Sequence, residues 1–328
     1  MGSAILKQLD TYGPERCQAL SPDEAVAYAH RLVRSQYENF SVVSLLVPRE
    51  LRDDFASVYA FCRWADDLGD ETGDRQRSLD LLGWWRAELE ACYRGEPRHP
   101  VFVALQPTIR RHEIPIDPFD HLIQAFEQDQ RVDRYQTWEQ VVDYCTRSAD
   151  PVGRLVLYVC GYRDAARQQL SDRTCTALQL INFWQDVRRD IVERDRIYVP
   201  ADALEQHGLT HDDLVGHVVG GQPLDVEQDE AYRKVIRELV ERTWPLFAEG
   251  RQLLPRVDRR VRLPIELFTL GGEAVMHRVE RIGYDTLNRR PRVGKATKLL
   301  LMGRAMCGRL RTMMGTSSGP AVGEGSGR

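Results

Sequence analysis

The sequence predicts an all-α protein folded as a single domain. Apolar residues recur with helical spacing along nearly the whole chain, and no segment shows the strict alternation typical of a strand. No hairpin turn separates β-branched runs. The 328 residues, 42% of them hydrophobic and 29% charged, are enough to bury a sizeable core. A net charge of -4 indicates no general attraction to nucleic acid.

Start and stop signals divide the chain into successive helices. The run Ser21-Pro22-Asp23-Glu24 combines an N-cap, a proline at the first helical position and acids in the first turn. Gly95 and Pro97 end the helix that follows Asp74. The predicted helices cover residues 22–37, 50–70, 74–93, 100–112, 117–129, 137–147, 151–161, 170–193, 227–251, 264–288 and 294–312.

Proline and glycine mark the interruptions of this pattern. Residues 39–48 are expected to form a connection, Pro151-Val152-Gly153 a kink or loop, and residues 220–223 a surface loop. No internal repeat or linker divides the chain. We therefore expect an N-terminal extension at residues 1–20, one helical domain at 21–312, and a disordered Gly/Ser-rich tail at 313–328.

Cysteine usage and hydropathy indicate the compartment. The seven cysteines are scattered, odd in number and without a Cys-x-x-Cys pair, so a disulfide framework or zinc site is not expected. The chain has no signal-peptide pattern and no run of about 18 apolar residues. We expect a cytoplasmic protein. The basic segment 295–311 lacks acidic residues, which fits peripheral contact with the inner membrane surface or a terminal bundle helix with a basic face.

Four polar side chains share one face of the helix predicted at residues 50–70. Tyr59, Arg63, Asp66 and Asp70 are spaced i, i+4, i+7 and i+11, which stacks them along one line of the helix. The other faces are apolar and suited to packing. Because carboxylates that enter a core need partners, this face predicts a charged ligand.

A second polar face follows on the helix predicted at residues 170–193. Asn182, Asp186 and Asp190 repeat every four residues, with Gln179 about one turn earlier. Like charges at this spacing repel, and a divalent cation removes the repulsion. Mg²⁺ prefers oxygen ligands from carboxylates and phosphates. Asp-x3-Asp alone would be typical of a solvated surface, and Asn-x3-Asp-x3-Asp alone would fit a surface or a metal site equally. Both together predict a clamp for Mg²⁺, or alternatively Mn²⁺, and a diphosphate.

Other cofactor sites fit the sequence less well. A di-iron bundle needs two Glu-x-x-His motifs, and Glu96-Pro-Arg-His99 contains a proline and has no second copy. The glycines of residues 323–327 have no predicted strand before them, so they do not form a dinucleotide fingerprint. No nicotinamide cofactor is expected.

Taken together, these motifs resemble the squalene/phytoene synthase family of head-to-head prenyl transferases. The resemblance covers about residues 36–292 and includes the Tyr-x3-Arg-x2-Asp-x3-Asp helix, the central break at residues 148–153, and the Gln-x2-Asn-x3-Asp-x3-Asp helix followed by Arg196-Ile-Tyr198. It implies a single isoprenoid-synthase-type helical bundle around a deep apolar cavity. It also implies a prenyl diphosphate substrate.

The resemblance implies a role for each matching residue. The metal ligands would be Asp66, Asp70, Asn182, Asp186 and Asp190. The diphosphate would contact Tyr59, Arg63 and Gln179, while Tyr198 would lie near the reacting centre. Ala149, Val152 and Gly153 would line a flap over the cavity. Asp66, Asp70, Tyr59 and Tyr198 are therefore the catalytic candidates.

Three departures from the common family pattern indicate a branch. Gln36–Phe40 replaces a serine-rich segment, Gln185 stands where an arginine is frequent, and Gly272 where a tyrosine is common. Together with residues 271–272 and 289–291 they resemble the bacterial hydroxysqualene synthase branch of squalene and hopanoid biosynthesis. That branch converts presqualene diphosphate and water into hydroxysqualene and diphosphate.

Two alternatives stay open at this point. One is a condensing synthase that makes presqualene diphosphate, squalene or phytoene from two prenyl diphosphates. The other is a non-catalytic assembly or binding relative, which would be expected to lose the aspartates that this chain keeps. Phe40 and Tyr59 are candidates beside the path of the cation, because aromatic faces stabilise positive charge, although Phe40 could equally be packed in the core. Asn39 is a further candidate for substrate binding.

Overall fold

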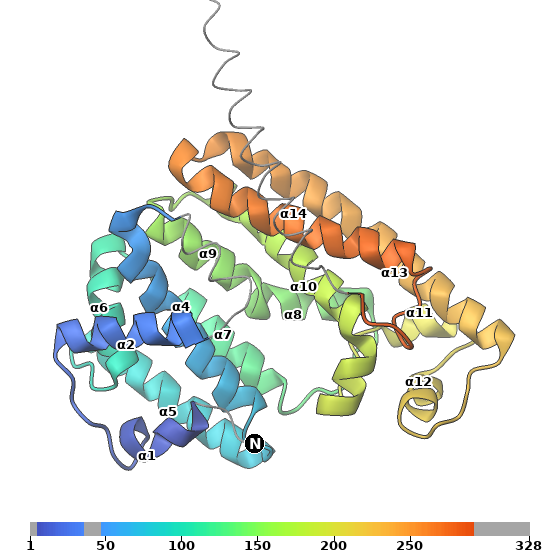
Figure 1. Cartoon of the computed structure of the whole chain (residues 1–328), viewed down its shortest axis with the longest axis horizontal. Coiled ribbons are helices and arrows are strands. Elements are labelled where there is room, and N and C mark those ends of the chain that lie inside the picture. Colours follow the sequence, from blue (N-terminus) through green and yellow to red (C-terminus); the bar gives the residue numbers. More distant parts are fainter. Residues whose placement is uncertain (1–4, 36–46, 292–328) are drawn as a thin grey trace, which may run out of the picture.

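The computed structural model describes residues 5–35 and 47–291, and these form one bundle of helices (Figure 1). No β-strand occurs among the described residues, which confirms the predicted all-α class. None of the helices described is both long and apolar enough to cross a bilayer. The segments 36–46 and 292–328 lie outside the description, and with them Asn39, Phe40, the basic segment 295–311 and the predicted tail.

The helices follow one another with short connections. Those of the first half are η1 (Leu6–Gln8), α1 (Leu9–Tyr12), α2 (Pro22–Ser35), η2 (Arg49–Leu51), α4 (Arg52–Asp70), α5 (Arg75–Arg94), α6 (Pro100–His112) and α7 (Asp117–Gln128). Those of the second half are α8 (Trp138–Ser148), α9 (Asp150–Val159), α10 (Ala165–Arg194), α11 (Ala201–Glu205), α12 (His211–Val218), α13 (Val226–Gly250), η3 (Arg251–Arg256) and α14 (Arg259–Arg281).

Several predicted boundaries agree with the structure because capping residues set them. The Asp74 side chain accepts a hydrogen bond from the Arg77 backbone N–H and begins α5, and Gly95 ends it in the left-handed conformation with φ 96°. The break predicted near Pro151 is also present, since α8 ends at Ser148 and α9 begins at Asp150. Pro151 then occupies the first turn of α9, where its missing N–H costs little.

Other boundaries were predicted wrongly. Helix α10 begins five residues earlier than expected, because Asp164 caps it by accepting from the Arg167 N–H. Helix α14 covers 259–281 rather than 264–288, because Asp258 caps its start and Pro264 near its beginning is tolerated. Helices α11 and α12 were not predicted, although Thr210 begins α12 with a capping box.

The N-terminal residues belong to the bundle as far as they are described. Ile5 is buried, and Leu6, Leu9 and Tyr12 pack against the core of the first half. The residues 5–12 therefore cover apolar surface of the domain, whereas the sequence led us to expect an extension.

The core has two main clusters of buried side chains. The first, around Trp64 and Trp85, joins α2 and α4 through α7. The second, around Trp184 and Phe247, joins α8, α10 and α13. Helix α9 packs on both α4 and α10, and α13 and α14 run along one edge of the molecule (Figure 1). The two aspartate-bearing helices, α4 and α10, are thus held by separate clusters on either side of α9.

Candidate active site

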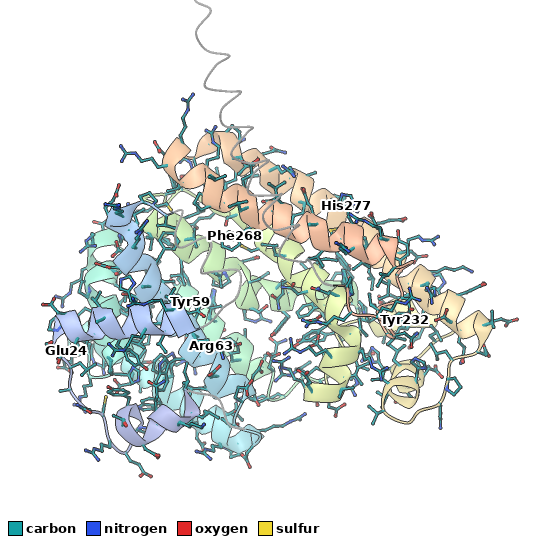
Figure 2. All side chains as sticks on the ribbon, viewed as in Figure 1. Glu24, Tyr59, Arg63, Tyr232, Phe268 and His277 are labelled. Atoms are coloured by element: carbon teal, nitrogen blue, oxygen red, sulfur yellow. The ribbon has the colours of Figure 1, made fainter. Side chains whose placement is uncertain are left out.

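The polar face of α4 carries four of the predicted site residues, Tyr59, Arg63, Asp66 and Asp70. Tyr59 and Arg63 follow one another along this helix (Figure 2). The Arg63 guanidinium lies 3.0 Å from Asp66 Oδ2 and also pairs with the buried Asp67. Arg63 Nε is buried and has no hydrogen-bond partner among the described residues. The side chain therefore keeps one donor for a further acceptor.

The polar face of α10 is closed at one end by the segment after α14. Arg290 donates to both oxygens of Asp186, at 2.6 and 2.8 Å. The Gln185 side-chain amide donates to the Pro291 carbonyl, and Arg188 donates to the Leu287 carbonyl at 3.3 Å. Residues 287–291 are thereby tied to the aspartate face of α10.

The two aspartate faces meet at one guanidinium. Arg194 Nε donates to Asp70 Oδ2 of α4 at 3.1 Å, and its terminal nitrogen lies 3.6 Å from Asp190 Oδ1 of α10. Arg196 approaches the other oxygen of Asp70 at 3.0 Å. The convergence expected from the two spacings is therefore present, although Arg194 was not predicted to lie between the carboxylates.

The carboxylates of this site attract positive charge. Burial, reinforced by the charge of Asp186, raises the pKa of Asp190 to about 7. Burial within the cleft and the charge of Asp70 raise the pKa of Asp66 in the same way, although 44% of its side chain is exposed. Arg194 opposes both shifts without cancelling them.

These residues fit a hard divalent cation by their chemistry. Within residues 5–35 and 47–291, no three His, Cys, Asp or Glu side chains are close enough to hold a metal ion, and the four aspartates are paired with arginines instead. The donors are oxygens on two facing helices, as Mg²⁺ prefers. Asn182 is exposed on the same helix as Asp186 and Asp190. The predicted ligand set remains an expectation that the donor chemistry supports.

A buried network beneath the carboxylates was not predicted. Asp129, 5% exposed, accepts hydrogen bonds from Tyr144 at 2.8 Å and from Tyr198 at 3.4 Å. Arg196, 8% exposed, lies 3.4 Å from Asp129 and connects it to Asp70. Burial and the nearby Asp129 charge raise the pKa of both tyrosines well above the usual value, so both stay protonated as donors.

The network also places the predicted residue Tyr198. Its ring stacks on Phe183 at 3.7 Å between centroids, and its hydroxyl is directed to Asp129. Tyr198 is thus connected to Asp70 indirectly: its hydroxyl contacts Asp129, Asp129 pairs with Arg196, and Arg196 pairs with Asp70. Asp129 follows α7 without any repeat in the sequence, so only the fold identifies it as a partner.

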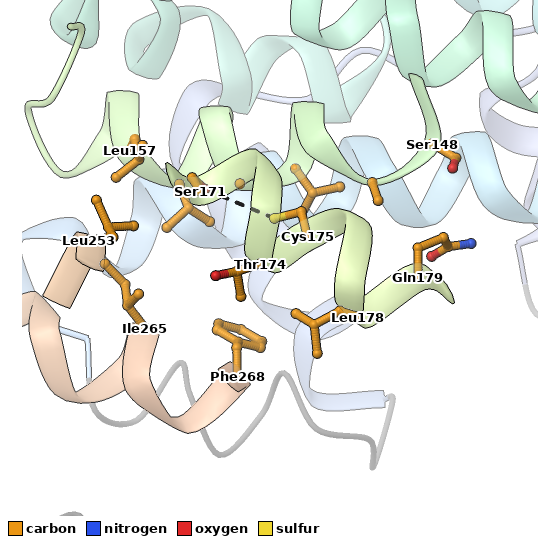
Figure 3. A pocket seen from close by; sticks show the side chains of 14 residues that line it. Ser148, Leu157, Ser171, Thr174, Cys175, Leu178, Gln179, Leu253, Ile265 and Phe268 are labelled. Atoms are coloured by element: carbon orange, nitrogen blue, oxygen red, sulfur yellow. Dashed lines mark hydrogen bonds between the residues drawn. The ribbon is translucent and has the colours of Figure 1, made fainter. Parts of the chain in front are cut away.

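Two apolar chambers lie beside α9. The larger has a volume of about 230 Å³ and lies between α9, α10, η3 and α14 (Figure 3). Its wall includes Ala149, Val152, Gly153, Val156, Leu157, Cys175, Leu178, Gln179, Leu253, Ile265 and Phe268. The smaller, about 220 Å³, lies between α4 and α9 and includes Tyr59 and Cys62. Val152 and Val156 belong to both walls, so α9 separates the chambers.

Five predicted substrate-binding residues lie in these walls. Tyr59 lines the smaller chamber, while Gln179 and Ala149 line the larger. Val152 and Gly153 belong to the first turns of α9, a wall helix, where the sequence suggested a flap. A Cβ at Gly153 would lie 2.4 Å from Ser171 Oγ and 2.5 Å from Cys175 Sγ, which explains the glycine at this close approach.

A close approach also explains the glycine at position 272. A Cβ there would lie 2.5 Å from Phe247 Cζ and 2.6 Å from Leu178 Cδ2. Because Leu178 also lines the larger chamber, a tyrosine at this position would require α10 and α14 to repack. The neighbouring Gly271 faces open space.

Comparison with known proteins identifies one family. A family model described as squalene/phytoene synthase matches residues 33–297. The hydroxysqualene synthase of Zymomonas mobilis is 32% identical over 285 residues, covering 84% of this chain and 89% of the relative. The phytoene synthase of Thermus thermophilus is 31% identical over 276 residues, covering 84% and 90%. The crystal structure of squalene synthase HpnC from Alicyclobacillus acidocaldarius has 46% identity and a TM-score of 0.73, covering 80% of this chain and 96% of that one.

Proposed function

The chain belongs to the squalene/phytoene synthase family, and we propose that within this family it converts presqualene diphosphate and water into hydroxysqualene and diphosphate. The observation that carries the proposal is the convergence of Asp70 and Asp190 beside two apolar chambers. One end of the site suits a diphosphate and the other a long hydrocarbon. The departures at Gln185 and Gly272 favour this reaction over the other family reactions, and one of several comparably similar relatives is named hydroxysqualene synthase.

The leaving group would be bound at the carboxylate end. Residues Asp66, Asp70, Asn182, Asp186 and Asp190 would hold Mg²⁺, which when bound supplies positive charge that stabilises the departing diphosphate. Arg63 would contribute a charged hydrogen bond, since its buried Nε has no acceptor among the described residues. This donor would be aimed at charge that increases as the C–O bond breaks.

The chambers would hold the hydrocarbon and limit its contact with water. The wall of the smaller chamber is apolar apart from the Tyr59 hydroxyl and the Cys62 thiol. The Tyr59 ring lies one turn from Arg63, so its face can stabilise positive charge that develops next to the leaving group. Burial raises the pKa of the Cys62 thiol to about 12, which keeps it protonated and a poor nucleophile toward a cation.

A condensing synthase is the second candidate, because the two chambers could each hold one prenyl chain. Relatives named phytoene synthase and presqualene diphosphate synthase are about as similar to this chain as the hydroxysqualene synthase. The substrate therefore decides between the two reactions. A condensing enzyme consumes farnesyl or geranylgeranyl diphosphate alone, whereas the proposed enzyme requires the joined C30 diphosphate.

The test supplies purified protein and Mg²⁺ with presqualene diphosphate or with farnesyl diphosphate. We expect a C30 alcohol from the first and no C30 product from the second. The Asp186→Asn variant serves as the control for contaminating activity. Turnover of farnesyl diphosphate without conversion of presqualene diphosphate would reject the proposed reaction in favour of condensation.

A peripheral membrane contact through residues 295–311 belongs to the same proposal, because a C30 product is more soluble in a bilayer than in water. Co-sedimentation with vesicles that contain anionic phosphatidylglycerol should exceed that with neutral vesicles and weaken as salt increases. Equal binding to both vesicle types would contradict an electrostatic contact.

A further inference from the structure

Ser148 carries an unpartnered buried hydroxyl in the wall of the larger chamber. Its Oγ is inaccessible to solvent and has no hydrogen-bond partner among the described residues. Three other buried hydroxyl groups, those of Ser57, Thr176 and Thr243, each donate to a carbonyl or carboxylate oxygen. Buried polar groups are normally paired, so the exception at Ser148 indicates a missing polar ligand.

The surroundings of Ser148 form the polar end of this chamber. Ser148 ends α8, and Pro151 has no N–H for the carbonyl of Arg147, so the helical hydrogen bond is missing at this break. In Figure 3, Ser148 and the Gln179 side-chain amide lie at the same end of the chamber. The opposite end is formed by apolar side chains, Leu157, Leu253 and Ile265.

We propose that Ser148 positions the water molecule that captures the carbocation, an inference that rests on the proposed function. A water inside a protein needs two to four polar partners. The Ser148 hydroxyl can both donate and accept, and the Gln179 amide can supply a further partner. Held here, the water meets the hydrocarbon in an otherwise apolar space, so the position of attack is restricted.

The step balances without any further reactant. The C–O bond to the diphosphate breaks, and its electron pair leaves with the diphosphate oxygen. The cyclopropylcarbinyl cation then rearranges: one ring C–C bond breaks and its electron pair becomes the π bond of a new C=C double bond, which leaves the positive charge on a chain carbon. A lone pair of the water forms the new C–O bond at that carbon. The protonated alcohol then loses its proton to the departed diphosphate or to solvent. Ser148 remains neutral throughout and acts as a positioning residue, since a serine hydroxyl is a poor base.

Two other hydroxyl groups in the chamber wall are less suited to this role. Ser171 Oγ lies 4.0 Å from Cys175 Sγ, so it has a weak partner already. Figure 3 shows Ser171 and Thr174 farther toward the apolar end than Ser148. Ser171 therefore provides a matched control, because its removal deletes a hydroxyl from the same chamber without changing the polar end.

The test incubates the full chain with presqualene diphosphate and Mg²⁺ and measures two products, hydroxysqualene and released diphosphate. The readout is the molar ratio of hydroxysqualene to diphosphate, called the alcohol fraction below. The informative pair is Ser148→Thr and Ser148→Val, whose side chains have nearly the same shape and differ by a hydroxyl. We expect Ser148→Thr to retain most of the alcohol fraction. Ser148→Val should lower it about tenfold in favour of hydrocarbons formed by proton loss, the order expected for one lost hydrogen bond.

The outcomes separate this inference from the proposed function. If the unaltered protein forms no C30 alcohol, the proposed function itself fails. If it forms the alcohol and Ser148→Val forms the same fraction, the role of Ser148 is rejected. An equal loss in Ser171→Ala would also reject it, because the effect would then follow from any change in the wall. Labelled water should place its oxygen in the alcohol of the unaltered protein, and no label would contradict capture by water.

Discussion

Replacing Arg196 with methionine should destabilise the protein in a pH-dependent manner. Arg196 is 8% exposed and Asp129 5%, so solvent screens their attraction little. The substitution keeps most of the side-chain volume but leaves the Asp129 carboxylate without its counterion. Removing one partner of a buried pair typically costs about 3–5 kcal/mol. Because Asp129 has a pKa of about 7 and can take up a proton, the charge-dependent part of the loss is limited to about 1.4 kcal/mol for each pH unit above 7, so we expect a loss of about 1–2 kcal/mol near pH 8.

The sign of the pH dependence follows from Asp129. Burial raises its pKa to about 7 even with Arg196 beside it. Because the pKa of Asp129 is higher in the folded protein than in the unfolded chain, its protonated form contributes stability that is fully present below the pKa of the unfolded chain. This stability is lost as pH increases through about 7. Without Arg196 the pKa should increase further. The destabilisation caused by Arg196→Met should thus be small near pH 5, where Asp129 is protonated, and larger near pH 8.

Urea unfolding of the metal-free protein, followed by tryptophan fluorescence at both pH values, measures this difference. Asp129→Asn in the Arg196→Met background removes the uncompensated charge and should recover a large part of the loss near pH 8. A free-energy loss that is equal at both pH values, or a double variant as unstable as the single one, would refute a charge-based role for this pair.

The remaining predictions concern activity, acid stability and packing. Asp70→Asn and Asp186→Asn should each lower kcat by about a hundredfold or more while far-UV circular dichroism is unchanged, because charge stabilisation of the leaving group is lost; full activity in either variant would remove that residue from the ligand set. Burial lowers the pKa of His99 to about 3, so stability is complete above pH 6.5 and should decline by about 1.4 kcal/mol per pH unit as pH falls below it. His99→Asn keeps a capping side chain and should remove this part of the slope in urea unfolding between about pH 7 and pH 5. Gly272→Ala should lower the melting temperature through its contacts at 2.5 and 2.6 Å, at a cost of about 1–3 kcal/mol, whereas Gly271→Ala should leave it unchanged or increase it.

The helical periodicity was sufficient to predict most of the fold. The long helices have an apolar face, and several begin at a capping residue, as α5 does at Asp74; these local signals are readable without tertiary structure. The short helices α11 and α12 were missed because so few turns give no clear period. The start of α14 was missed because Pro264 suggested a beginning there, while the cap at Asp258 decides it.

The candidate site was predictable only where its residues repeat along one helix. Their spacing along one helix indicates Asp66 and Asp70, and likewise Asp186 and Asp190. The structure brings these two helix faces together. Asp129 and Tyr144 come from different helices and have no such pattern, so their hydrogen bond at 2.8 Å required the fold. Arg194 and Arg196 could be read from the sequence, but the carboxylates with which they pair depend on which helices are in contact.

The site has a carboxylate part and an apolar part, and in the proposed reaction each would control a different step: release of the diphosphate and formation of the product. In the proposed reaction the carboxylates and arginines would act on the diphosphate, and every reaction that begins with departure of the diphosphate could use them unchanged. After departure of the diphosphate, the path of the resulting cation would depend on the side chains of the chamber wall as well. We expect the product to depend there on the close contacts at Gly153 and Gly272 and on the Ser148 hydroxyl, which has no partner among the described residues. Exchange of chamber residues should therefore change the product before it changes the release of diphosphate.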